Sequence, residues 1–155
     1  MSKHFTLTAV KALADGVLAL AYADGEQLQV DVKPIIRRHP TLRELAAPAV
    51  FKRAKLGEWG GSVTWGKDAL ELAADNLRAR AIEQAGGVSH EYLITWMARN
   101  NFTLDQAAEV LDISRRMLAY YRSGAKPVPR VVALACAELS DKPWAPNDER
   151  FCLAA

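Results

Sequence analysis

The sequence predicts an α+β fold, with an N-terminal region of antiparallel sheet and short helices followed by an all-helical region. Before Gly86-Gly87, short stretches alternate apolar and polar residues and are separated by turn dipeptides. After these glycines, apolar residues recur at helical spacing almost to the end of the chain. The 155 residues are enough for two small domains. We place an α+β domain at 1–86, a helical domain at 87–141 and a C-terminal tail at 142–155.

Two Asp-Gly dipeptides predict the turns of a three-stranded antiparallel meander. Asp15-Gly16 joins a first strand, near 6–12, to a second at 17–23. Asp24-Gly25 joins that second strand to a third at 26–32. Both central residues of such a tight hairpin can take positive φ. The apolar residues that alternation assigns to the facing positions of one buried face are Leu18, Leu20, Tyr22, Leu28, Val30 and Val32.

The rest of the N-terminal region predicts short helical turns, a second hairpin and one longer helix. Pro34 interrupts the third strand, and residues 41–47 suit one or two helical turns. A second hairpin is expected from 51 to 65, around the glycine-rich segment 57–61. Leucine and alanine at helical spacing predict a helix over 70–84.

Cap residues divide the C-terminal region into helices. Ser89 can cap a first helix that runs to about Asn100. Thr103 and Gln106 have the spacing of a capping box, in which the threonine hydroxyl accepts from a backbone N–H while the glutamine side chain reaches back. This box predicts a second helix over 104–111.

The third helix follows a short turn. Asp112 is placed at the turn, where a short polar side chain tolerates a left-handed backbone, and Ile113 is expected to pack into the core. Ser114 caps a helix over 115–123, and Gly124 ends it.

This third helix carries a basic face. Leu118 and Tyr121 are expected to pack inward, which leaves Arg115 and Arg122 outward. Between Arg115 and Arg130 there are five basic residues and no acidic one, so positive charge is gathered locally although the net charge is only +2.

A basic helix with small and aromatic neighbours suits the major groove of double-stranded DNA. Arginine can pair with guanine through two hydrogen bonds, and small or aromatic side chains can contact thymine methyl groups. Helix N-termini and nearby cations suit phosphates. The predicted base-contacting residues are Ser114, Arg115, Arg116, Ala119 and Tyr120. The predicted phosphate-contacting residues are Thr103, Gln106, Arg122, Lys126 and Arg130.

The stretch FTLDQAAEVLDISRRMLAYYRSGAKPVPR, followed by VVALACAEL, resembles the Cro/phage-repressor family of helix-turn-helix domains, the Xre-type or lambda-repressor-like family. Ala108 fills the small position of the first motif helix, and Leu111 and Ile113 fill the apolar positions around the turn. Asp112 stands where the family usually has glycine. The resemblance covers about a third of the chain and implies a DNA-binding domain in its C-terminal half.

The N-terminal half resembles a small uncharacterised bacterial domain family. The matching features are the Asp24-Gly25 hairpin, the strand end Val30-Asp31-Val32, and Trp65 followed by the segment 68–72. Members occur with helix-turn-helix domains or beside toxin-like genes. The resemblance therefore implies a dimerising or partner-binding role without catalysis.

Residue chemistry predicts no enzyme, no cofactor and no metal site. His4, His39 and His90 are isolated from one another, and Cys136 and Cys152 have neither disulfide-framework nor metal-knuckle spacing. The glycine-rich segment lacks the lysine and hydroxyl pair of a phosphate loop. No apolar run is long enough to span a bilayer, and we expect a cytoplasmic protein.

The leading hypothesis is a dimeric, sequence-specific transcription regulator that acts as a repressor. Either the apolar helix at 131–139 or the N-terminal sheet could form the dimer. The main alternative is an antitoxin that binds a toxin through residues 1–86 and regulates its own gene through the helix-turn-helix. A ligand sensor with a pocket at Trp59 and Trp65 is a third possibility, and an undetected enzyme a remote fourth.

Overall fold

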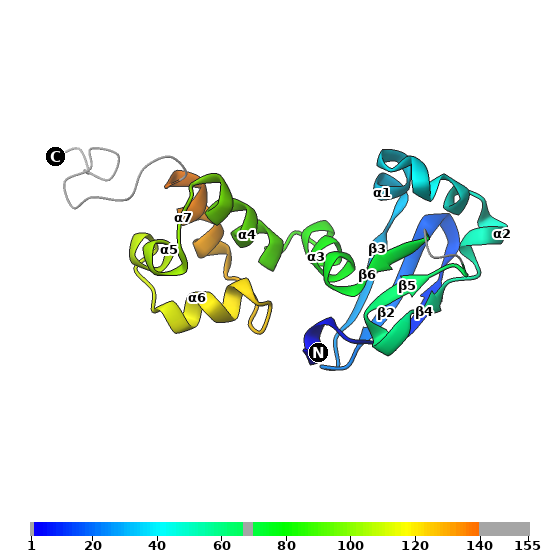
Figure 1. Ribbon diagram of the computed structural model, residues 1–155, viewed down its shortest axis with the longest axis horizontal. Helices are drawn as coiled ribbons and strands as arrows, with labels where there is room; N and C mark the ends of the chain where they lie inside the picture. The colour runs from blue at the N-terminus through cyan, green and yellow to red at the C-terminus, as the bar shows by residue number, and fades with distance from the viewer. Residues whose placement is uncertain (1, 67–69, 140–155) are drawn as a thin grey trace. The chain divides into compact units, whose positions relative to one another are not determined.

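The computed structural model describes residues 2–66 and 70–139, and the chain divides into two compact units, residues 1–89 and 90–155 (Figure 1). The fold mixes helices with antiparallel sheets, which confirms the predicted α+β class. The division falls close to the domain boundary that we placed after residue 86. The C-terminal tail that we placed at 142–155 lies outside the described residues.

The first unit contains two three-stranded sheets with helices packed around them. Its elements are η1 (Lys3–Phe5), β1 (Leu7–Ala12), η2 (Ala14–Gly16), β2 (Val17–Tyr22), β3 (Gln27–Asp31), α1 (Lys33–Arg38), η3 (Pro40–Ala46), α2 (Pro48–Phe51), β4 (Lys55–Leu56), η4 (Glu58–Gly60), β5 (Ser62–Thr64), β6 (Glu71–Ala73) and α3 (Ala74–Gln84).

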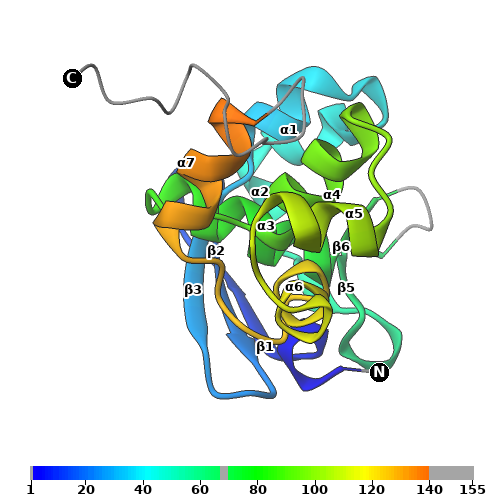
Figure 2. The ribbon, with the colours of Figure 1, turned by 90° about the vertical axis from the view of Figure 1, so that its left-hand side faces the viewer.

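The predicted meander is present, with β1, β2 and β3 side by side in antiparallel order (Figure 2). Leu18 lies opposite Val30, as alternation predicts. Asp15 and Gly16 take positive φ, at 58° and 71°. The second turn differs from its prediction, because only Gly25 has positive φ, at 95°. There the Asp24 carboxylate instead accepts a hydrogen bond from the backbone N–H of Glu26 at 3.1 Å.

Local propensity misplaced three elements of the first unit. Pro34 does not only end the sheet: it lies in the first turn of α1, where its fixed φ suits a helix and its missing N–H costs no hydrogen bond. Phe51 ends the helix α2 instead of starting a strand. The segment 71–73 is the strand β6, because it pairs with β5 and so overrides the helical preference of its leucine and alanine. The helix α3 therefore begins at Ala74 and not at Leu70.

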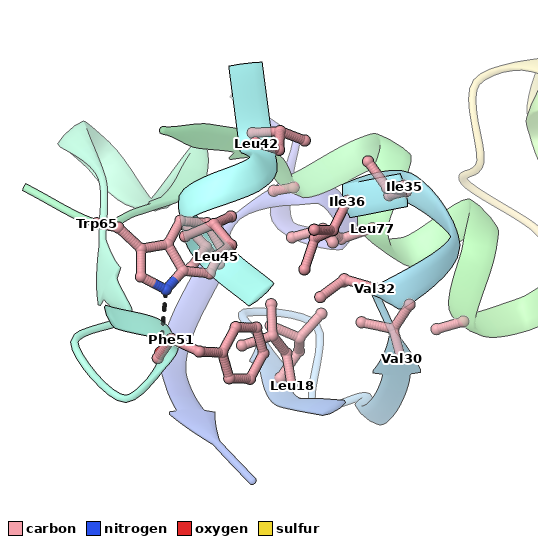
Figure 3. Close-up of a cluster of buried hydrophobic side chains, with 14 of the residues drawn as sticks. Leu18, Val30, Val32, Ile35, Ile36, Leu42, Leu45, Phe51, Trp65 and Leu77 are labelled. Carbon is pink, nitrogen blue, oxygen red and sulfur yellow. Dashed lines mark hydrogen bonds between the residues drawn. The ribbon is translucent and has the colours of Figure 1, made fainter. Parts of the chain in front are cut away.

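The core of the first unit lies between the meander, α1, η3 and α3 (Figure 3). Leu18 from the meander, Val32 between β3 and α1, and Leu77 from α3 are fully buried. Trp65 is 5% exposed, and its indole N–H donates to the carbonyl of Phe51 at 3.0 Å, the dashed contact in Figure 3. The two rings stack with centroids 6.0 Å apart, so α2 and the residue that follows β5 are held together by both packing and a buried hydrogen bond.

The second unit is helical over its described residues. Its elements are α4 (His90–Arg99), α5 (Leu104–Val110), α6 (Arg115–Arg122) and α7 (Arg130–Glu138). The helix α6 packs against α4 and α5, and α7 packs against α4. The apolar side chains that these helices bury are Leu93, Trp96, Met97, Ala107, Ala108, Leu118, Val132 and Cys136. The two buried alanines of α5 let neighbouring helices approach closely, as their small size predicts.

After the C-terminal ends of α4 and α5, an asparagine and an aspartate occupy the left-handed position where many helices have glycine. After α5, Asp112 has φ 52°, its N–H donates to Glu109, and the N–H of Ile113 donates to the carbonyl of Ala108 at 3.0 Å. These are the two hydrogen bonds of a Schellman motif. Asn101 has φ 53° in the same position after α4. The predicted turn at Asp112 is therefore present, with the backbone geometry that glycine would adopt at lower cost.

Candidate nucleic-acid interface

The predicted basic helix is α6, and its position is set by one buried side chain and one cap. Leu118 is fully buried. The Ser114 hydroxyl accepts a hydrogen bond from the backbone N–H of Met117 at 3.1 Å, which satisfies a donor at the start of the helix. The side chains of Arg115, Arg116 and Arg122 are consequently left exposed, whereas Tyr121 is half-buried.

At the N-terminal end of α6, Arg115 is held by an acidic residue of α5. Its Nε lies 3.3 Å from Oδ1 of Asp105, and both side chains are well exposed, at 67% and 70%. An exposed ion pair of this kind contributes little to stability and is screened by salt. The contact nevertheless orients the guanidinium and places a negative charge beside it. Sequence reasoning missed Asp105, because the count of charges began at Arg115 and left out the preceding helix.

A second cluster joins three of the predicted residues around one ring. Nε of Arg116 donates to the hydroxyl of Tyr120 at 2.9 Å, and its guanidinium carbon lies 5.6 Å from the Tyr120 ring centroid. Nζ of Lys126 lies 5.0 Å from the same centroid. Both distances suit cation–π attraction. Tyr120 is half-buried. Because Arg116 and Lys126 both contact its ring, two positive charges come together at one place on the surface.

The capping box that we predicted at Thr103 is present. The Thr103 hydroxyl accepts from the N–H of Gln106 at 3.2 Å, and Oε1 of Gln106 accepts from the N–H of Thr103 at 2.9 Å. Both side chains are exposed. The box uses the oxygen of Gln106 and leaves its amide nitrogen as a donor at the start of α5.

The remaining predicted contacts occupy different parts of the unit. Arg122 is the last residue of α6, and Arg130 is the first residue of α7. Both are exposed, and within 2–66 and 70–139 neither forms an ion pair. Ala119 is half-buried, so it offers less surface than its neighbours. The structure thus joins Arg116, Tyr120 and Lys126 by direct contacts and leaves Arg122 and Arg130 separate from that cluster.

The two tryptophans of the third possibility, a ligand pocket, differ in exposure. Trp59 is 86% exposed, whereas Trp65 is 5% exposed and donates a hydrogen bond to the carbonyl of Phe51, so Trp65 offers little surface to a ligand. Among the residues that the structure describes, no group of histidine, cysteine and acidic side chains could hold a metal ion. In the same part of the chain, no helix has the length and apolar character that crossing a membrane requires.

Two comparisons relate the chain to known proteins. Residues 7–83 match the family described as "Protein of unknown function (DUF2442)". A solved structure from Nitrosomonas europaea, described as that of a proposed DNA-binding protein, is 43% identical, with all of each chain covered and a TM-score of 0.84. No match was found among curated proteins. The chain therefore belongs to the same family as the Nitrosomonas europaea protein, and its residues 7–83 form a DUF2442 domain.

Proposed function

We propose that this protein is a sequence-specific DNA-binding transcription regulator, with α5 and α6 as a helix-turn-helix and α6 as its recognition helix. The observation that carries the proposal is the exposed basic face of α6, capped by Ser114 and fixed beneath by Leu118. The related protein from Nitrosomonas europaea, described as a proposed DNA-binding protein, supports the same function. The resemblance of this segment to phage repressors agrees with it.

Arg115 and Arg116 are the proposed readers of base edges, because they lie in the first turn of α6, the part of a recognition helix that reaches deepest into the groove. The Asp105 contact occupies the Nε edge of the Arg115 guanidinium, and the edge formed by its two terminal nitrogens is the one proposed to bind guanine. Arg116 is already extended along Tyr120. Ser114, Ala119 and Tyr120 complete the proposed base-contacting surface.

The proposed phosphate contacts surround this surface. Lys126 and Arg122 follow the recognition face toward its C-terminal end, and Thr103 and Gln106 lie at the start of α5. Arg130, at the start of α7, is the fifth. Phosphate contacts fix the register of a protein on DNA and release counterions, so they supply affinity that depends on salt and not on sequence.

We further propose that the protein acts as a dimeric repressor. The helix α7 exposes Val131 and Leu134 by 69% and 61%, which is unusual for apolar side chains three residues apart on one helix. Tyr92 and Ile94 of α4, the helix that packs against α7, are also partly exposed. Burial of such a surface between two copies would place two recognition helices on half-sites about 34 Å apart.

The alternative is an antitoxin in which residues 1–86 bind a toxin. The separate compact unit at 1–89 supports a role of its own for this part of the chain, since α6 belongs to the other unit. Co-expression with the product of an adjacent toxin-like gene distinguishes the two roles: a complex that survives deletion of 90–155 would favour the antitoxin.

The decisive experiment is selection of bound sequences from random duplex DNA. Wild-type protein should enrich a near-palindromic sequence, and Arg115→Ala or Arg116→Ala should lose that preference, because each base contact is worth roughly 1–3 kcal/mol. Lys126→Ala should weaken binding to all sequences alike and lower the salt slope by about one unit.

Arg53→Ala is the matched control, since it removes an exposed positive charge from the other unit. It should leave both preference and affinity close to wild type. Absence of sequence preference in the wild-type protein at every salt concentration would overturn the regulator. A Lys126→Ala protein that selected a different operator would overturn the phosphate role of Lys126.

A further inference from the structure

The first unit contains a cavity of about 490 Å³ between the η2 turn, α1 and α2. This volume lies within the range of small-molecule sites, about 300–1,000 Å³. The cavity is distinct from the Trp59 and Trp65 region, and all its lining residues fall between Ala12 and Lys52. It therefore belongs to one unit and needs no contribution from α6 or its neighbours.

The floor of the cavity is apolar. Ile36 from α1, Leu45 from η3 and Phe51 from α2 line it, and these three side chains are 8%, 2% and 4% exposed. They are anchored in the core of the unit, because Phe51 stacks on Trp65 and accepts the hydrogen bond from its indole. Such a floor is preformed and offers an apolar ligand a rigid surface.

The rim of the cavity is mainly positive. Lys33 and Arg37 from α1 and Lys52 after α2 line it, against one carboxylate, that of Asp15. Nζ of Lys33 lies 3.6 Å from Asp31, so part of its charge is already neutralised. Arg37 and Lys52 are exposed and form no ion pair within the described residues. Two unneutralised cations thus stand at the mouth of an apolar pocket.

We propose that this cavity binds a small organic anion with an apolar body, such as an aromatic or aliphatic carboxylate or sulfonate. The apolar body lies on Ile36, Leu45 and Phe51, and the anionic group contacts Arg37 and Lys52 at the rim. Charge complementarity selects the anion, because Arg37 and Lys52 gain an ion pair with an anionic group and none with a neutral ligand. The proposal does not rest on DNA binding.

The Asp15 carboxylate should weaken the binding of an anion in this cavity. It is exposed and lines the same cavity, so it repels an anion that Arg37 and Lys52 attract. Asp15 also has φ 58°, a backbone conformation that asparagine adopts as readily. Asp15→Asn therefore removes the charge and keeps the shape of the η2 turn.

Two fluorescent probes of nearly the same shape test the proposal on the full chain. Anilinonaphthalene sulfonate carries an anionic group on an apolar body, and N-phenylnaphthylamine is the same body without the sulfonate. The anionic probe should bind at one site and at least several-fold more tightly than the neutral probe. Its affinity should fall as salt rises, because exposed charges are screened.

Matched substitutions place the site. Arg37→Gln and Lys52→Gln should each weaken the anionic probe about threefold to tenfold, and Asp15→Asn should tighten it about twofold. Arg38→Gln and Arg53→Gln remove equal charges from exposed neighbours that do not line the cavity, and they should leave its affinity unchanged. Amide chemical shifts on titration should move chiefly between residues 12 and 52.

Three outcomes would overturn the proposal. The first is equal affinity for the two probes in the wild-type protein. The second is an equal loss of affinity in Arg37→Gln and Arg38→Gln. The third is a set of shifted amides confined to residues 90–139, which would place the anionic probe on the helical unit. All three leave the selection of DNA sequences unaffected, so failure here is distinguishable from failure of the proposed regulator.

Discussion

Cationic side chains occur in both units, but their surroundings differ. Arg116 on α6 and Lys126 in the segment that follows this helix lie against the ring of Tyr120, and both side chains are exposed. In the first unit, Arg37 and Lys52 stand around a cavity whose floor is apolar. The first arrangement suits an extended polyanion such as DNA, because exposed cations on a helix surface can contact the phosphates that border a groove. The second suits a single small anion, because an apolar body must accompany the charge.

The net charge of the chain reveals neither of these two arrangements. The chain as a whole has a net charge of +2, yet each unit gathers several cations at one place. Phosphate and carboxylate contacts act over a few ångströms, so local arrangement decides binding.

The largest expected effects are losses of stability when a buried leucine is removed from the core of either unit. Leu118→Ala and Leu77→Ala each remove a fully buried leucine and should each lower the free energy of unfolding by about 2–5 kcal/mol. Thermal unfolding followed by circular dichroism measures the loss. Once heating unfolds the helical unit, the Leu118→Ala protein should no longer bind DNA. The Leu77→Ala protein should still bind DNA when heating unfolds its first unit, because α6 belongs to the other unit. Loss of DNA binding in Leu77→Ala while residues 90–139 stay folded would contradict this division of roles.

Alkaline pH should destabilise each unit through a different buried group. Burial raises the pKa of the Cys136 thiol from its usual 9.0 to about 12 in the helical unit, and burial also raises the pKa of the Tyr22 hydroxyl above 10.0. Above its usual pKa, each group loses its proton in the unfolded state and keeps it in the folded state. Stability should therefore fall as pH rises, from about pH 9 for Cys136, by up to about 1.4 kcal/mol per pH unit.

Urea unfolding at a series of alkaline pH values measures this slope. Cys136→Ala should flatten the dependence of the helical unit between about pH 9 and 12, and Tyr22→Phe should flatten the dependence of the first unit above about pH 10. A Cys136→Ala protein with an unchanged slope would show that the thiol is not the group responsible.

The capping box should contribute about 1 kcal/mol to the helical unit. Thr103→Ala removes the hydroxyl that accepts from Gln106, and it should lower the free energy of unfolding by about that amount. Thr95→Ala is the control, because Thr95 is exposed in the middle of α4, where it caps nothing. Equal losses in the two variants, measured by urea unfolding, would show that the cap is not the source.

The smallest effects are expected at the two left-handed positions. Asp112 and Asn101 both have positive φ, which glycine adopts without steric strain. Asp112→Gly and Asn101→Gly should therefore each stabilise the helical unit by about 0.5 kcal/mol. Only Asp112→Gly also removes a negative charge next to the proposed recognition helix. It alone should tighten DNA binding at low salt, measured by fluorescence anisotropy, and an equal change in Asn101→Gly would rule out the electrostatic cause.

Much of the fold follows from short-range signals in the sequence. The meander was predictable because alternation and two Asp-Gly turns agree with each other, and the helices α5 and α6 because their caps are explicit. The strand β6 was not, because Glu71, Leu72 and Ala73 favour a helix and only pairing with β5 makes them extended. Short-range preference fails where a distant segment supplies the hydrogen bonds.

The candidate sites were predictable to different degrees. Arg116 and Tyr120 are four residues apart on one helix, so their contact follows from helical geometry. The Arg115 contact with Asp105 crosses a turn between two helices, and helical spacing alone does not reveal it. The cavity draws Asp15, Arg37 and Lys52 from three separate segments, and no local pattern in the sequence brings these together.

The Arg115 contact has a consequence for how the proposed complex would respond to salt. Asp105 acts as a counterion that is tethered to the protein, held 3.3 Å from the cation that it neutralises. Its local concentration does not change when salt is diluted, unlike that of free chloride. Added salt weakens this internal pair together with the contact that Arg115 makes with DNA. The two losses oppose each other, so Arg115 should bind DNA with a weaker dependence on ionic strength than Lys126, which has no tethered counterion within the described residues.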